Sequence, residues 1–169
     1  MENINRLEKR MYAMVLRQLS PMQKGIQALH AVVNYSQHIK NLEKYSGQPE
    51  LCQVYNEWAD IDKTMIILDV GTSKELLDTL YSLQYYNIYV SDFNECDLDD
   101  ITTAFCFIVD ERVWNAVKYP SYNSYALRFV GDMNSDQIFE QYVNEIWNGE
   151  PFKEYLELRD LIFSKKLSL

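Results

Sequence analysis

Three polar residues near the start of the chain are spaced so that they could bind one ligand together. Gln23, Gln27 and His30 stand at positions i, i+4 and i+7, so an α-helix would place them on one face. Gln23 would lie in the first turn of this helix, where free backbone amides and the positive end of the helix dipole favour negative charge. This spacing predicts a site for a phosphate or a carboxylate, with Ser20 at its edge.

The same residues also have purely structural explanations. Gln23 could complete a capping box with Ser20, whereas Gln27 and His30 could satisfy buried backbone groups, and for His30 we favour the structural role. Lys24 is the only cation of the first turn, and it could neutralise a ligand phosphate from the rim of the site. A solvated surface lysine is the alternative that we favour for Lys24.

Acidic residues and threonines further along the chain form a second group of candidates. Asp97, Asp99 and Asp100 could supply a general base or oxygen ligands for a divalent cation. Their spacing does not match a calcium-binding loop, so we expect no metal and favour a solvated turn. Thr102 and Thr103 could add hydroxyl groups to the same pocket, although β-propensity alone explains threonines at the start of a strand.

The elements that must position these residues alternate between strands and helices. Hydrophobic patterning predicts strands at residues 11–16, 64–70, 88–93 and 102–109. Capping signals and periodicity predict helices at residues 20–44, 50–58, 73–86, 135–147 and 151–165. Since crossovers between parallel strands are right-handed, we expect an α/β fold with a small four-stranded mixed sheet and helices on both faces. Residues 1–118 would form this core, and a tyrosine-rich segment and two helices in residues 119–169 would pack on it.

The long first helix has two different apolar sides. One side carries the larger apolar residues Ile26, Leu29 and Val33. Their positions predict that the helix begins buried and becomes exposed toward its end. Its other side is small and suited to close packing, and it contains Ala28, Ala31 and Val32.

A tyrosine-rich segment follows the predicted core. Tyr119, Tyr122 and Tyr125 could stack on a base or a nucleoside, as aromatic residues do in nucleic-acid sites. Packing within the protein, or contact in a homodimer, is the explanation that we favour.

Composition restricts the classes of partner. The net charge of −9 and the pI near 4.7 argue against tRNA as a partner, because affinity for nucleic acids comes largely from Lys and Arg. Three cysteines without metal-site or disulfide spacing indicate free thiols. The N-terminal region has no secretory signal pattern and no apolar stretch long enough to span a bilayer, so we expect no membrane partner and a cytoplasmic location.

The segment from Leu19 to Ala31, LSPMQKGIQALHA, resembles the first helix of type II peptidyl-tRNA hydrolases. That family carries a K-x-x-x-Q-x-x-H-A string there, of which Gln27, His30 and Ala31 match. The order and spacing of the later strands and helices also agree, so the resemblance covers residues 11–109. It implies the hydrolase fold for this part of the chain.

Two departures from the family pattern concern its hydrolytic chemistry, which is usually assigned to the first lysine of that string and to an Asp and a Thr in a D-A-G-x-T-Q loop. This chain has Gln23 in place of the lysine, and its loop reads ECDLDDIT from Glu95 to Thr102. It looks closer to divergent hydrolase-like proteins of phages and some bacteria, in which a Q-x-x-x-Q-x-x-H string and an acidic loop replace the catalytic ones.

Three functions remain open at this point, and the first is the one we favour. The chain could bind or sequester a small nucleotide-type or other anionic ligand in the ancestral pocket without catalysis or a cofactor. It could instead be an active peptidyl-tRNA hydrolase, with Asp97 as the base and Lys24 as electrostatic support. It could also be a protein–protein interaction module that acts through its tyrosine-rich segment and C-terminal helices.

Overall fold

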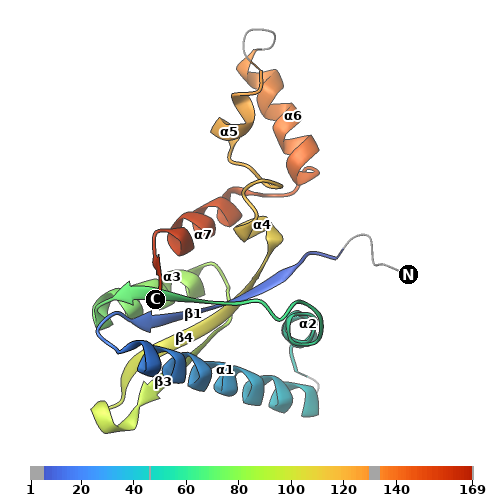
Figure 1. Ribbon diagram of the computed structural model, residues 1–169. Helices are drawn as coiled ribbons and strands as arrows, with labels where there is room; N and C mark the ends of the chain where they lie inside the picture. Colours follow the sequence, from blue (N-terminus) through green and yellow to red (C-terminus); the bar gives the residue numbers. More distant parts are fainter. Residues whose placement is uncertain (1–5, 46, 130–133, 169) are drawn as a thin grey trace.

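The computed structural model describes residues 6–45, 47–129 and 134–168, which form an α/β fold built on one five-stranded mixed sheet (Figure 1). The strands are β1 (Lys9–Leu16), β2 (Met65–Gly71), β3 (Val90–Glu95), β4 (Ile101–Asp110) and β5 (Lys166–Leu167). Their order in the sheet is β3-β4-β1-β2-β5. The prediction of four strands was therefore incomplete, because the short β5 at the end of the chain pairs with the edge of β2.

The helices are α1 (Pro21–Lys44), α2 (Pro49–Glu57), α3 (Ser73–Tyr85), α4 (Glu111–Trp114), α5 (Tyr122–Ala126), α6 (Ser135–Trp147) and α7 (Lys153–Phe163). A π-helical turn follows α2 at Trp58–Asp62, and a 3₁₀ turn joins β3 to β4 at Cys96–Leu98. In the described residues, no helix is both long enough and apolar enough to cross a membrane.

Only the pair of β1 and β2 is parallel, and the other neighbouring strands run antiparallel. The parallel strands end beside each other at Leu16 and Gly71, and α1 begins a few residues beyond this edge. The carboxyl ends of parallel strands are where ligands collect in open α/β sheets. This edge is therefore the place where the topology would support a site.

Alternation along β1 divides the core into two layers. Met11, Ala13 and Val15 point to the side covered by α1 and α2. Tyr12 and Met14 point to the opposite side, where residues of α3 and α7 complete the core. Helices therefore cover both faces of the sheet, as the strand pattern predicted.

The burial of α1 confirms the prediction of a small, close-packing side, but the prediction that the larger apolar residues begin buried was wrong. Ile26, Leu29 and Val33 are exposed, whereas the small side of the helix, with Ala28 and Ala31, lies fully buried against the sheet. The sheet beneath the helix also presents small residues, Ala13 and Ala104 among them, so the two surfaces can approach closely. A small helical side therefore packs better there than the bulky one would.

The C-terminal region holds a separate aromatic cluster. Tyr125, Tyr142 and Trp147 are buried in it, and Tyr119 and Tyr122 pack against them. Helices α5 and α6, which form much of this cluster, project away from the sheet in Figure 1, while α7 returns to it. The tyrosines therefore pack within the protein, which was the favoured interpretation of this segment.

A buried arginine links α7 to the chain that leads into this cluster. Arg159 donates hydrogen bonds from three guanidinium nitrogens to the backbone carbonyls of Val113, Tyr119 and Arg112, at 2.6, 2.6 and 2.7 Å. These bonds satisfy both the buried donors and the carbonyl groups of an irregular segment. The arginine thereby holds the segment after β4 against α7.

Candidate functional site

The start of α1 is fixed by a complete capping box. The Ser20 hydroxyl accepts from the backbone amide of Gln23, and the Gln23 side-chain Oε1 accepts from the backbone amide of Ser20 at 3.0 Å. Both side chains are thus engaged in starting the helix, which confirms the structural interpretation of Gln23. Gln23 itself is exposed to solvent.

Lys24 is buried, so the prediction of a solvated surface lysine was wrong. Only 7 % of the residue is exposed, and its Nζ donates to Asp69 Oδ2 at 2.9 Å. The other carboxylate oxygen, Oδ1, also lies 2.9 Å from Nζ but accepts no hydrogen bond from the described residues. Asp69 lies two residues before the end of β2, so this ion pair lies at the edge of the sheet where the parallel strands end.

Gln27 lies one turn further along the same side of α1 and is also buried. Its Nε2 donates to Glu95 Oε2 at 2.6 Å, and its Oε1 accepts from the Thr103 hydroxyl at 3.0 Å. The amide group therefore bridges the last residue of β3 and a fully buried residue of β4. Both partners of Gln27 are side chains, so it does not satisfy buried backbone groups as the structural alternative proposed.

His30 is exposed, which contradicts a role in satisfying buried backbone groups. Its ring lies over the side of Phe93, with 4.4 Å between ring centroids and 56° between planes. It makes no side-chain hydrogen bond within the part of the chain that the structure describes. The imidazole is therefore free to contact a ligand or another chain.

The remaining candidates divide between this cluster and the neighbouring turn. Thr103 belongs to the cluster through Gln27, whereas the Thr102 hydroxyl donates to Asn94 Oδ1 at 2.7 Å. Asp97 is exposed in the turn between β3 and β4, and its carboxylate has no hydrogen-bond donor among the described residues. The structure therefore brings Lys24, Gln27 and Thr103 together with their partners Asp69 and Glu95, and we call these five residues the polar cluster. Asp97 lies outside it.

The acidic turn has the geometry of a solvated loop. Asp99 and Asp100 both have positive φ, at 55° and 58°, which aspartate tolerates better than most residues. The described residues contain no group of three or more His, Cys, Asp or Glu side chains placed to hold a metal ion.

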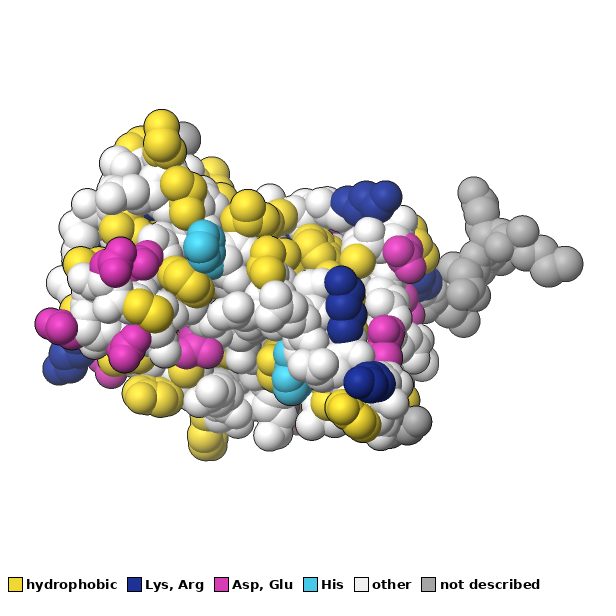
Figure 2. All heavy atoms as spheres, turned by 90° about the horizontal axis from the view of Figure 1, so that it is seen from below, with side chains coloured by type: hydrophobic (Ala, Val, Ile, Leu, Met, Phe, Trp, Pro, Cys, Tyr) yellow, Lys and Arg dark blue, Asp and Glu magenta, His cyan; other side chains and the backbone are white. Residues whose placement is uncertain are grey.

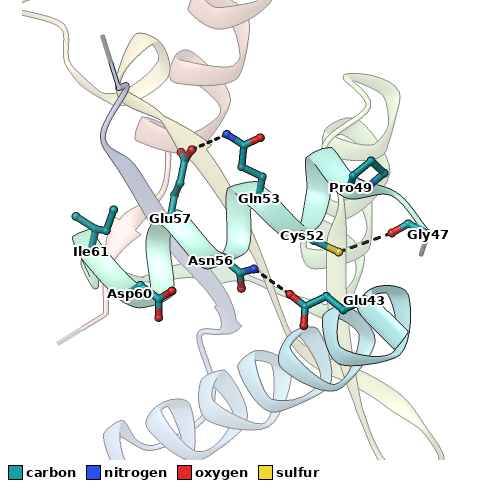
Figure 3. A pocket seen from close by; sticks show the side chains of 9 residues that line it. All are labelled: Glu43, Gly47, Pro49, Cys52, Gln53, Asn56, Glu57, Asp60 and Ile61. Carbon is teal, nitrogen blue, oxygen red and sulfur yellow. Dashed lines mark hydrogen bonds between the residues drawn. The ribbon is translucent and has the colours of Figure 1, made fainter. Parts of the chain in front are cut away.

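A pocket of about 660 Å³ lies elsewhere, between the end of α1 and α2 (Figure 3). Its surface is mostly apolar, with carboxylates, amides and one buried thiol among the lining residues. These residues are Glu43, Gly47, Pro49, Cys52, Gln53, Asn56, Glu57, Asp60 and Ile61. Two of its carboxylates already have protein partners, since Asn56 donates to Glu43 and Gln53 donates to Glu57. None of the residues singled out from the sequence lines this pocket.

Two members of the polar cluster, Asp69 and Glu95, were not identified from the sequence as site residues. Asp69 follows four apolar residues within the strand TMIILDV, and an acidic residue in such a run is a signal for a buried partner. Glu95 has no comparable signal, because it stands in a stretch that is acidic throughout.

The fold and this cluster define an α/β protein with a mixed sheet, a C-terminal helical region and a closed polar centre at its parallel edge. No family model matches the chain, and a search of curated proteins finds no match.

Proposed function

We propose that this chain is a divergent, non-hydrolytic protein of the type II peptidyl-tRNA hydrolase-like kind that binds a small nucleotide-type or other anionic ligand beside the start of α1. One observation carries the absence of hydrolysis. The ammonium group of Lys24 is buried and lies 2.9 Å from both oxygens of Asp69. A lysine paired in this way cannot present a free positive charge to the oxygen of an ester.

The other residues of the site support the same conclusion. Gln23, which stands where the resemblance expects lysine, is neutral and is occupied by the capping box. Asp97 is exposed and lies outside the cluster, so it is not placed as a base beside Lys24 or Gln27. The carboxylates that do contact these two residues, Asp69 and Glu95, are each engaged by them. General base catalysis requires a base within hydrogen-bond reach of the proton that it removes.

A nucleotide-type ligand suits the mixture of groups around His30. The exposed imidazole and the Phe93 ring offer a surface for a base, and stacking on aromatic groups tolerates different bases. Glu95 can accept a hydrogen bond from a sugar hydroxyl or an exocyclic amine, and the N-terminal end of α1 favours a phosphate. A simple anion would be repelled by Glu95 and would gain neither the stacking contact nor the hydrogen bond that a nucleotide makes.

Calorimetry with mononucleotides, cyclic dinucleotides and ADP-ribose tests this proposal. His30→Ala should weaken binding about tenfold, in line with the loss of one stacking contact. The matched control is His38→Ala, because His38 also stacks on an aromatic residue, Tyr89, but lies two turns further along α1. Silence across the panel, or equal loss in both variants, would contradict the proposed site.

A model peptidyl-tRNA tests the absence of catalysis separately. We expect no release of peptide above the uncatalysed rate. Release that is abolished by Lys24→Ala or by Asp97→Ala would show that the chain is a hydrolase after all.

A further inference from the structure

The outer side of α1 carries an apolar stripe that no described residue covers. Met22, Ile26, Leu29 and Val33 recur at helical spacing, with 77, 45, 59 and 44 % of each residue exposed. At about 100° per residue these positions lie opposite the buried side that contains Ala31. Soluble proteins rarely expose a continuous row of large apolar side chains unless it contacts a partner.

Charge is distributed unevenly along this stripe. Lys40 and Lys44 continue it toward the end of α1, since Lys40 stands about five turns after Met22. Both lysines are exposed, and neither forms an ion pair within the described residues. The stripe is therefore apolar in its first half and carries two lysines in its second half, where the exposed Glu43 stands beside it.

The opposite end of the same face is acidic. The turn between β3 and β4 lies at the end of the molecule where α1 begins (Figure 1), and it exposes Asp97, Asp99 and Asp100. Leu98 and Ile101 in this turn are also exposed, by 49 and 43 %. Figure 2 shows acidic side chains gathered at this end and apolar side chains along the face, whereas at the other end basic side chains stand among acidic ones.

We propose that two copies of this chain pair through this face, with their α1 helices antiparallel and a two-fold axis near Leu29. A two-fold interface must be complementary to itself. In the antiparallel arrangement the apolar half of one stripe meets the apolar half of the other, and the acidic turn of each copy meets Lys40 and Lys44 of its partner. A parallel arrangement would instead oppose acid to acid and lysine to lysine.

The size of the face is also consistent with a pair of identical chains. The 24 residues of α1 extend over about 36 Å, but one helix pair alone buries less than the roughly 800 Å² per partner of a stable interface. The β3–β4 turn enlarges the contact at both ends of the helix pair with Leu98 and Ile101. In a pair of identical chains each copy contributes its own β3–β4 turn, so one turn lies at each end of the helix pair. This inference rests on the exposed stripe and not on the proposed ligand.

Sedimentation velocity over a range of concentrations tests the pairing. The wild-type chain should form a dimer, and Leu29→Glu should raise its dissociation constant about 100-fold or more, because two like charges would face each other at the axis. Tyr81→Glu on α3 is the matched control, since Tyr81 is equally exposed, at 61 %, but lies on the other side of the sheet. A monomeric wild-type chain, or a dimer that Leu29→Glu leaves intact, would overturn the proposal.

Charge reversal distinguishes this arrangement from any other apolar dimer. The double variant Lys40→Glu and Lys44→Glu should weaken the dimer about tenfold, and so should Asp97→Lys with Asp99→Lys. Combining all four changes in one chain should restore most of the affinity, because the charges of Asp97 and Asp99 and those of Lys40 and Lys44 are then reversed together. Losses that simply add in the combined variant would overturn the antiparallel arrangement.

A native cysteine gives a geometric test. Cys96 is exposed in the acidic turn, which lies at the end of the molecule where α1 begins (Figure 1), whereas Lys40 lies about 28 Å along α1 from Pro21. Links that a short thiol-to-amine reagent forms between Cys96 and Lys40 or Lys44 should therefore join two different copies. Mass spectrometry of mixed isotopically labelled and unlabelled chains reports whether the linked peptides come from different copies. Links confined to one copy, or none to these lysines, would contradict the arrangement.

Discussion

Replacing Lys24 by methionine should destabilise the protein strongly, although Lys24 lies in the first turn of a helix. Methionine keeps the apolar stem but removes the charge, so Asp69 would remain with no cation beside it. Breaking a buried ion pair by removing one partner costs about 3–5 kcal/mol. Because the Lys24 and Asp69 side chains retain 9 and 15 % exposure, we expect a loss of about 2–4 kcal/mol.

Urea unfolding monitored by tryptophan fluorescence measures this loss, since the chain contains three tryptophans. With a slope of about 2 kcal/mol per molar urea, the midpoint should fall by about 1–2 M. Lys74→Met is the matched control, because Lys74 is an exposed lysine in the first turn of α3 and should change the free energy of unfolding by less than about 0.5 kcal/mol.

The double variant identifies the cause of the loss. Lys24→Met combined with Asp69→Asn removes the uncompensated charge, so it should be more stable than Lys24→Met alone by about 1 kcal/mol or more. If Lys24→Met behaves like Lys74→Met, the lysine is solvated and the buried ion pair does not exist in solution. In that case the argument against hydrolysis also fails.

Three further predictions concern other parts of the fold. The Arg6 guanidinium lowers the pKa of Asp62 through hydrogen bonds at 2.7 and 2.5 Å, so Asp62→Asn should destabilise the protein at neutral pH. This difference should be fully present above the unfolded-state pKa of about 3.9 and should vanish as the pH falls through the lower folded-state value, which urea unfolding at several pH values measures. Cys96 should react with a thiol reagent at least about tenfold faster than the two buried cysteines, as peptide mapping after brief labelling would show; equal rates would contradict their burial. Tyr142→Phe should cost about 1–2 kcal/mol by urea unfolding, because the Pro120 carbonyl loses a buried donor at 3.0 Å, and no change would indicate that water replaces it.

Local signals in the sequence were sufficient for the longer elements of the fold but not for the short α4, α5 and β5. Ser20 and Gln23 form the capping box that their spacing predicts, and so do Thr72 and Glu75 at the start of α3. These motifs act within a few residues, so their hydrogen bonds do not depend on the rest of the chain. β5 was missed because a strand of two residues has no periodicity, and it exists only through pairing with β2.

The side of a helix that becomes buried was not decided locally. Spacing places Ile26, Leu29 and Val33 on one side of α1 and Ala28 and Ala31 on another, but both sides are apolar. The small residues of the sheet determine which side fits, and those residues come from distant strands. The same tertiary choice exposes the stripe on which the proposed dimer depends.

By itself, the sequence determined the approximate positions of the longer helices and strands, which polar residues share a helical face and that the chain folds as an α/β protein. Only the tertiary structure decided what those polar residues contact. Lys24 is 45 positions from Asp69, and Gln27 is 68 positions from Glu95 and 76 from Thr103. Such pairs form because the sheet brings distant strands beside α1, where low solvent exposure makes an unpaired charge costly. A residue's spacing reveals its neighbours on a helix, whereas its charge partner depends on how the whole chain packs.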